Sequence, residues 1–328
     1  MIIKYLKNTL KLCIIHYGLR LKPYRMQNAI LIFSEARGGS TWLMELLHHV
    51  PKTILNWEPL HVEKGVVPKE MNLGWRPYLT KNNATLEHKK LFENILLLKR
   101  FTPWTTRYVY WKEVFTSKHV VTKFVRANMC LPWIVEQFPE LSYKPVFLLR
   151  HPIAVALSRL KTFNRLDLES IREPLKGADY YTIPECLNND RYIEHASFIK
   201  GLQTRLEIEV ALWCLNNMMV INHPNKTLWV TVCYEDLVVA PQATFEKLLQ
   251  AMGVKVPTSI LNSIPYRRAS SSNYHGNLKQ DPLAQLSNFL KLLSKEELTR
   301  IQTIFDYFEL KIYTAFKADS NKKSHVFN

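Results

Sequence analysis

Glycine is scarce in this chain of 328 residues, which contains nine of them. None of the nine is followed by lysine, so the sequence lacks the G-x-x-x-x-G-K-[ST] loop that holds the phosphates of nucleoside triphosphates. A nucleotide kinase needs such a loop together with a carboxylate that binds magnesium. The missing loop therefore argues against the kinase class, and it leaves open other ways of binding a phosphorylated ligand.

Acidic residues are also few. The chain has 28 Asp and Glu against 44 Lys and Arg, which gives a formal net charge of +16 at pH 7. Such an excess implies an anionic partner: nucleotide phosphates, an acidic polymer or anionic lipid. No zinc-ligand spacing or nucleic-acid-binding module is present, so nucleic acid is not the expected partner. A non-catalytic protein that binds anionic polymers or membrane remains the alternative to an enzyme.

The five cysteines show no Cys-x-x-Cys spacing and no pairing with histidines. An odd number at wide intervals indicates neither a metal site nor a disulfide framework. We interpret most of them as buried free thiols, which suits a reducing, cytoplasmic compartment. The cysteines are Cys13, Cys130, Cys186, Cys214 and Cys233.

Long uncharged apolar runs are missing from residues 1–27, which contain six Lys or Arg and no acid. The lysines rule out a simple membrane-spanning helix, and the short apolar run fits a signal peptide poorly. Apolar and basic residues fall on opposite faces of a helix, so we expect a basic amphipathic segment packed on the domain. Peripheral contact with an anionic membrane is the alternative.

Residues 29–48 are the most informative stretch that is present. An apolar run, Ala29 to Phe33, predicts a strand buried on both faces of a parallel sheet, and helical spacing begins at Thr41. Between them lies a turn that contains Arg37 and two glycines. A glycine-containing turn, a cation and a helix N-terminus together make an anion site. The alternative is an ordinary turn in which Ser or Thr caps the helix.

A second strand-to-helix unit follows at residues 145–160. The apolar run 145–149 leads into Arg150, His151 and Pro152, and Ser158 comes eight residues after the arginine. Proline suits the first helical turn, where its missing N–H would be unpaired anyway. Arg150 is therefore a cation at a strand end. Taken alone, it could equally form an ion pair with a neighbouring carboxylate.

Further apolar runs at 53–56, 120–124 and 227–233 alternate with helical patterns. This alternation predicts an α/β fold with a central parallel sheet and helices on both faces. Ligands of such sheets bind beyond the carboxyl ends of the strands, where Arg37, Glu58 and Arg150 would meet.

One domain is expected over residues 28–316, with two insertions. The first, 62–118, is rich in aromatic and basic residues, and we expect it to be largely helical. Its aromatics either line a cleft for an acceptor or pack in the core. The second, 161–205, is polar and indicates a loop-rich insertion or a lid, and residues 317–328 form a polar tail.

The two turns together resemble the donor-binding motifs of sulfotransferases. The first stands here as Arg37-Gly38-Gly39-Ser40-Thr41-Trp42, with Gly38 in place of the usual Ser. The second has Arg150 and Ser158, with His151 in place of the usual Asp. Trp57-Glu58-Pro59-Leu60 is similar to a segment of the carbohydrate sulfotransferases that modify Gal, GalNAc or GlcNAc. Tyr234-Glu235-Asp236-Leu237 matches another family hallmark, which we interpret as structural.

The resemblance implies a P-loop-like three-layer fold and transfer of a sulfuryl group from 3′-phosphoadenosine 5′-phosphosulfate (PAPS) to an acceptor hydroxyl. It assigns the 3′-phosphate to Arg150 and Ser158, and the stabilisation of the leaving phosphate to Arg37. The acceptor would be a saccharide, a glycolipid or a small alcohol, and no metal is required. The 5′-phosphosulfate would be held by the loop residues Arg37, Gly38, Gly39, Ser40, Thr41 and Trp42.

Glu58 is the candidate base for the acceptor hydroxyl, and His61 is the second candidate. The alternative for Glu58 is a strand-end carboxylate paired with Arg37 or Lys123. Lys123 and Arg126 are candidate supporting cations.

Overall fold

The computed structural model describes residues 2–125, 127–175, 190–268, 270–271 and 281–321. Outside these residues lie Arg126, Cys186, part of the 161–205 insertion and the end of the polar tail.

Within the described residues, five parallel strands form one sheet with the order β2-β3-β1-β4-β5. Because all five are parallel, their carboxyl ends lie along the same edge. All six residues of β1 are buried, as expected for a central strand covered on both faces. The strands are β1 (Ala29–Ser34), β2 (Thr53–Trp57), β3 (His119–Phe124), β4 (Val146–Leu149) and β5 (Val230–Cys233).

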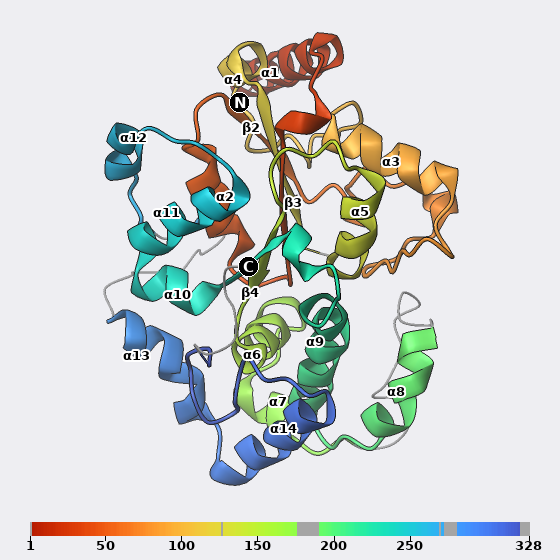
Figure 1. Ribbon diagram of the computed structural model, residues 1–328, viewed down its shortest axis with the longest axis vertical. Helices are drawn as coiled ribbons and strands as arrows, with labels where there is room; N and C mark the ends of the chain where they lie inside the picture. The colour runs from red at the N-terminus through yellow and green to blue at the C-terminus, as the bar shows by residue number, and fades with distance from the viewer. Residues whose placement is uncertain (1, 126, 176–189, 269, 272–280, 322–328) are drawn as a thin grey trace.

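Helices cover both faces of the sheet, which confirms the predicted α/β architecture (Figure 1). Leu31 and Phe33 of β1 point to the layer that contains α5, α6, α9 and α14, whereas Ile30 and Ile32 point to α2 and α11. The helices are α1 (Ile2–Leu21), α2 (Ser40–His48), α3 (Leu86–Leu96), α4 (Trp111–Thr116), α5 (Leu131–Gln137), α6 (Pro152–Phe163), α7 (Leu168–Arg172), α8 (Asp190–Lys200), α9 (Arg205–Ile221), α10 (Tyr234–Val239), α11 (Pro241–Met252), α12 (Thr258–Ser263), α13 (Pro282–Ser287) and α14 (Lys295–Tyr307).

The first insertion differs from its prediction. Residues 62–118 contain only α3, α4 and a short 3-10 turn at Lys69–Met71, so the segment is mostly irregular and not largely helical. The physical reason is that its aromatics lack helical spacing and pack from loops. The start of β5 also differs from the apolar run at 227–233, because residues 226–228 form a 3-10 turn and the strand begins only at Val230.

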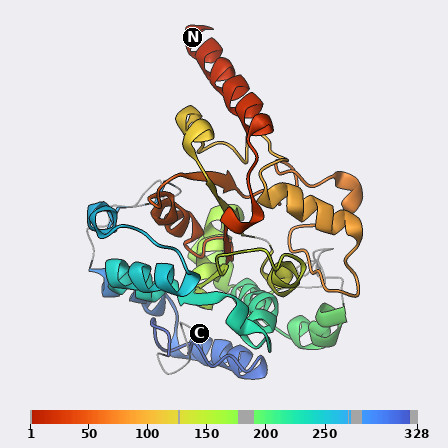
Figure 2. The ribbon, with the colours of Figure 1, turned by 45° about the horizontal axis from the view of Figure 1, so that its top comes forward.

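The N-terminal helix α1 packs on the body through its C-terminal half. Ile15 and Leu19 are buried in a cluster with Ile54, Val114 and Val120. Figure 2 shows the rest of α1 projecting away from the body. None of the described helices combines the length and the apolar character that crossing a membrane would require.

Three of the four described cysteines are buried free thiols, as expected, and Cys13 on α1 is exposed. Burial raises the pKa of Cys130 and Cys233 to about 12, so both thiols stay protonated.

Candidate active site

The turn between β1 and α2 depends on two glycines. Gly39 has φ 93°, and a Cβ there would collide with the ring of Tyr234. A Cβ on Gly38 would collide with Ser34 Oγ and lie 2.8 Å from the carbonyl oxygen of Glu35. The N–H of Gly38 donates to that same carbonyl at 2.9 Å. Gly38 therefore shapes the turn and is not among the residues that line the cavity described below.

The N-terminus of α2 lacks the Ser or Thr cap that the sequence left open as an alternative. Its N-cap residue is Gly39, and no side chain makes a cap hydrogen bond. Ser40, Thr41 and Trp42 form the first turn and line the cavity. Because the first N–H groups of a helix have no partner inside it, this end of α2 is suited to an anion.

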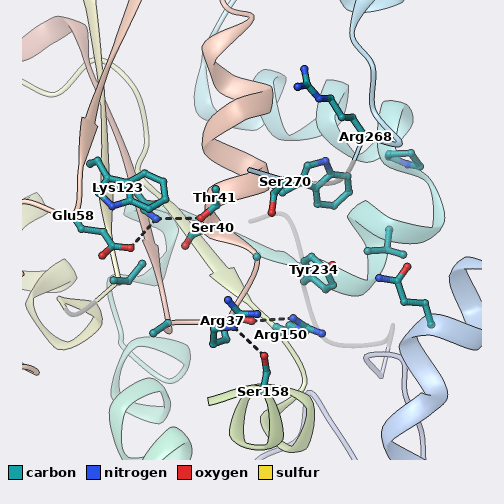
Figure 3. A pocket seen from close by; sticks show the side chains of 18 of the residues that line it. Arg37, Ser40, Thr41, Glu58, Lys123, Arg150, Ser158, Tyr234, Arg268 and Ser270 are labelled. Atoms are coloured by element: carbon teal, nitrogen blue, oxygen red, sulfur yellow. Dashed lines mark hydrogen bonds and ion pairs between the residues drawn. The ribbon is translucent and has the colours of Figure 1, made fainter. Parts of the chain in front are cut away.

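Arg37 and Arg150 meet at the base of this cavity although 113 positions separate them (Figure 3). Nη1 of Arg150 donates to the carbonyl oxygen of Arg37 at 2.9 Å, and Nε of Arg37 donates to Ser158 Oγ at 3.0 Å. Burial, and then the positive charge of Arg150, lower the pKa of Arg37. Two guanidinium groups are thus held together against their mutual repulsion.

A buried polar cluster links α6 to the turn between β1 and α2. Glu35 accepts from Nη1 of Arg159 at 3.2 Å and from Nδ2 of Asn216 on α9 at 3.2 Å. Arg159 also pairs with Glu209 at 3.4 Å. Since Ser158 is the neighbour of Arg159 on α6, this cluster fixes the position of the hydroxyl that contacts Arg37.

At the end of β2, Glu58 pairs with Lys123 of β3, with 2.9 Å between Oε1 and Nζ. The lysine, which is only 1% exposed, also donates to Thr41 Oγ1 at 3.3 Å, and its Nζ lies 3.1 Å from the ring centroid of Trp57. Of the two partners considered for Glu58, the structure therefore selects Lys123. Glu58 still lines the cavity, so the ion pair orients its carboxylate there.

His61 lines the same cavity, and its ring contributes to a turn. Nδ1 accepts hydrogen bonds from the backbone N–H groups of Glu63 and Lys64, both at 3.3 Å. In the neutral ring the proton then resides on Nε2, which makes that atom a donor. His61 is consequently less well arranged than Glu58 to accept a proton.

His151, which stands where the family usually has Asp, is fully buried under the site. Its backbone N–H donates to Oε1 of Glu235 at 2.9 Å, and its ring Nε2 lies 3.0 Å from the carbonyl oxygen of Thr314. Tyr313 donates to the other carboxylate oxygen of Glu235 at 2.9 Å. Burial lowers the pKa of His151 to about 4 and raises that of Glu235 to about 7. These contacts support the structural interpretation for Glu235.

The cavity has a volume of about 430 Å³ and gathers the predicted residues, with the exception of Gly38. Tyr234, which we interpret from the sequence as structural, also lines the cavity: its ring lies 4.6 Å from the Arg150 guanidinium carbon and packs on Gly39. The sequence also assigned no role to Arg267, Arg268 and Ser270, which line the same cavity; Figure 3 labels Arg268 and Ser270. Two adjacent arginines in a polar loop were the available signal.

Among the described residues that line the cavity, the buried side-chain polar atoms without a hydrogen-bond partner are nearly all donors. Among the described residues, buried nitrogens without a hydrogen-bond partner include Nε of Arg150 and the indole N–H groups of Trp42, Trp57 and Trp104, and each of these residues lines the cavity. The hydroxyl of Tyr266 is the other unpaired atom on the lining. Such a set fits a ligand that is rich in acceptor oxygens, such as a phosphate or sulfate ester. In the described part of the chain, His, Cys, Asp and Glu form no group of three that could hold a metal ion.

Comparison with known proteins agrees with this chemistry. Residues 29–258, more than two thirds of the chain, match the model of the Sulfotransferase family. A search of curated proteins finds no match. The chain thus belongs to the sulfotransferase family and is a sulfuryl-transferring enzyme.

Solved structures with similar folds are distant in sequence. The sulfotransferase domain of the Synechococcus PCC 7002 olefin synthase is 18% identical, with a TM-score of 0.45, over 89% of this chain and 100% of that one. Mouse sulfotransferase SULT7A1, solved in complex with PAP, is 12% identical, with a TM-score of 0.42, over 88% and 87% of the two chains. A sulfotransferase from Alicyclobacillus acidocaldarius is 13% identical, with a TM-score of 0.37, over 85% and 95%.

Proposed function

We propose that this enzyme transfers the sulfuryl group of PAPS to a hydroxyl group of a saccharide, either free or in a glycolipid. The observation that carries the proposal is the convergence of Arg37 and Arg150 in one cavity that also contains the start of α2. An ordinary structural arginine is matched by a carboxylate. Here two guanidinium groups approach each other, and a doubly anionic nucleotide would relieve their repulsion.

In this proposal different residues bind the two anionic ends of the donor, the 5′-phosphosulfate and the 3′-phosphate. The N–H groups and hydroxyls of Ser40 and Thr41, together with Arg37, hold the 5′-phosphosulfate and stabilise the charge that develops on the leaving phosphate. Arg150 and Ser158 hold the 3′-phosphate, and Ser158 also orients Arg37 by accepting the hydrogen bond from its Nε. Bound PAPS supplies the sulfuryl group, and the protein supplies position and neutralising charge.

Glu58 acts as the base that accepts the proton of the acceptor hydroxyl. Lys123 supports this role, because it contacts both Glu58 and Thr41 and so fixes the carboxylate relative to the donor loop.

A saccharide acceptor rests on the resemblance of residues 57–60 to carbohydrate sulfotransferases. The aromatic rings give it less support, since the ring of Trp57 already has Lys123 Nζ over it and that of Trp104 has the Arg107 guanidinium at 4.6 Å. The rings are therefore engaged with cations, and hydrogen bonds to sugar hydroxyls would have to provide most of the recognition.

The activity is tested by incubating the full chain with sulfur-labelled PAPS and a panel of glycans, glycolipids, aliphatic alcohols and phenols. Label on a glycan or glycolipid is the expected result. Label on phenols alone would overturn the saccharide assignment, and label on no acceptor, with no binding of adenosine 3′,5′-bisphosphate, would overturn the donor as well.

The donor site is tested separately with Arg150→Ala. Losing one charge-assisted contact to phosphate costs about 1.5–3 kcal/mol, so the affinity for adenosine 3′,5′-bisphosphate should fall by about 10- to 100-fold. Titration calorimetry measures it. Arg205→Ala is the matched control, because Arg205 is exposed at the start of α9 and does not line the cavity. Equal affinity of the wild type and Arg150→Ala would contradict the 3′-phosphate assignment.

A further inference from the structure

Helices α1 and α4 expose a row of apolar side chains at the end of the sheet opposite the active site. Their exposed fractions run from 39% for Ile14 to 69% for Tyr17. We call this row the α1–α4 surface; it consists of Leu10, Ile14, Tyr17 and Leu21 on α1 and Tyr110, Trp111 and Phe115 beside and on α4. Seven large apolar side chains with this exposure on two adjoining helices exceed the scattered single residues of an ordinary surface.

The exposed stripe on α1 is separate from the side that packs on the body. Positions 10, 14, 17 and 21 recur at helical spacing and form one stripe along the helix. Ile15 and Leu19, 1% and 2% exposed, point instead into the body. Attachment of α1 to the domain therefore leaves the stripe uncovered.

Contacts between the helices join the two halves of the surface. A Cβ on Gly18 would lie against Val114 and 3.9 Å from the ring of Phe115. Lys22 Nζ donates to the carbonyl oxygen of Phe115 at 2.9 Å. The aromatic residues of α4 thus continue the stripe of α1 on a connected scaffold.

The charges around this surface have one sign. Residues 1–34 contain no Asp or Glu, and Arg20, Arg25, Lys112 and Lys118 are exposed nearby. The acid of α4, Glu113, is occupied within the body, because its carboxylate pairs with His48 at 2.8 Å. The surface therefore combines apolar and aromatic side chains with uncompensated cations.

We propose that the α1–α4 surface docks this enzyme on an anionic lipid bilayer, with α1 lying in the headgroup region. Apolar side chains would enter the acyl boundary, Tyr and Trp would lie at the interface, and Lys and Arg would meet lipid phosphates. A second copy of the chain is the weaker occupant, since pairing the stripe with itself would bring two basic segments without acids together. The projection of α1 in Figure 2 gives a flat membrane access to it.

The test is flotation of the full chain with vesicles of phosphatidylcholine alone or mixed with phosphatidylglycerol. The wild type should bind the mixed vesicles and lose binding in high salt. Leu10→Ser/Tyr17→Ser/Leu21→Ser should lower the partition coefficient by about tenfold or more, since each buried apolar group contributes to binding. Leu86→Ser/Leu228→Ser/Phe316→Ser is the matched control, because these residues are 44% to 66% exposed elsewhere and should leave binding unchanged.

The charge contribution is tested with Arg20→Glu/Lys112→Glu, which should weaken binding to the mixed vesicles and leave any binding to the neutral vesicles unchanged. The proposal is overturned if the wild type binds neither the neutral nor the mixed vesicles. It is overturned as well if the triple serine variant binds the mixed vesicles as tightly as the wild type does. It is also overturned if the wild type is a dimer that does not bind vesicles and the triple serine variant is a monomer. Affinity for adenosine 3′,5′-bisphosphate, which these variants should retain, separates this result from failure of the proposed function.

Discussion

At the scale of single residues, the proposed role of Glu58 as the base is the part of the mechanism that a single substitution tests most directly. It has φ 40°, a left-handed conformation that a non-glycine residue seldom adopts. Such strain persists when the surroundings hold it, and here the ion pair with Lys123 does so. The conformation turns the carboxylate at the end of β2 into the cavity.

We expect Glu58→Gln to lower kcat by about 10²- to 10⁴-fold, because it removes a proton acceptor and keeps the shape of the side chain. Affinity for adenosine 3′,5′-bisphosphate should change little. Steady-state rates with the best acceptor of the panel measure the effect. His61→Ala is the comparison: if it abolishes turnover while Glu58→Gln retains it, the base is His61.

How far the sequence predicts the site differs from residue to residue. Arg37, Arg150 and Ser158 follow from motifs, because each belongs to a short strand-turn-helix pattern. The partner of Glu58 does not follow, since the choice between Arg37 and Lys123 depends on strand order and register, with Trp57 opposite Lys123. Arg267 and Arg268 reach the cavity from a loop after α12, and no local pattern encodes where such a loop folds back.

At the scale of elements, the strands were predictable because each is buried on both faces and therefore continuously apolar. The bounds of β1 and β3 differ from the apolar runs by one residue. The helices of the first insertion were not predictable in the same way, because large aromatics pack equally well from loops. Helix α10 was also missed, since Tyr234-Glu235-Asp236-Leu237 has the composition of a polar turn and is helical through its packing.

Two buried groups join β4, α6 and α10 and give the fold opposing responses to pH. Glu235, with its pKa raised from 4.5 to about 7, contributes stability that is present at low pH and lost as the pH rises through 7. His151, with its pKa lowered from 6.5 to about 4, contributes stability that is present above 6.5 and lost as the pH falls toward 4. Between pH 4.5 and 6.5 the two slopes have opposite signs and offset each other.

Glu235→Gln should therefore reveal the histidine. Relative to the wild type, its free energy of unfolding should fall by an additional amount of about 1.4 kcal/mol per pH unit as the pH is lowered from 6.5 toward 4.5. Urea unfolding across that range measures the slope. Glu140→Gln, an exposed carboxyl, should keep the wild-type slope. Parallel slopes for Glu235→Gln and the wild type would show that Glu235 does not titrate in this window.

At the scale of the whole molecule, the net charge of +16 creates a field that attracts an anionic donor. Attraction at long range is screened once the Debye length falls to about 10 Å, near 0.1 M salt. We expect the KM for PAPS to rise with ionic strength while kcat changes much less, because contacts inside the cavity are shielded from salt. Initial rates over a salt series, with the unfolding temperature as control, measure this. A KM independent of salt would place the attraction in the cavity alone.

The position of α1 at the amino ends of the strands has a consequence for the choice of acceptor. Ile54 and Val120, which pack with it, are the second residues of β2 and β3, whereas Glu58 follows the last residue of β2. Strands of this length span about 17–20 Å. An enzyme bound to lipid through α1 would therefore have its active-site cavity facing the aqueous phase. Long or freely diffusing glycans would reach the cavity, whereas short headgroups in the same leaflet would not.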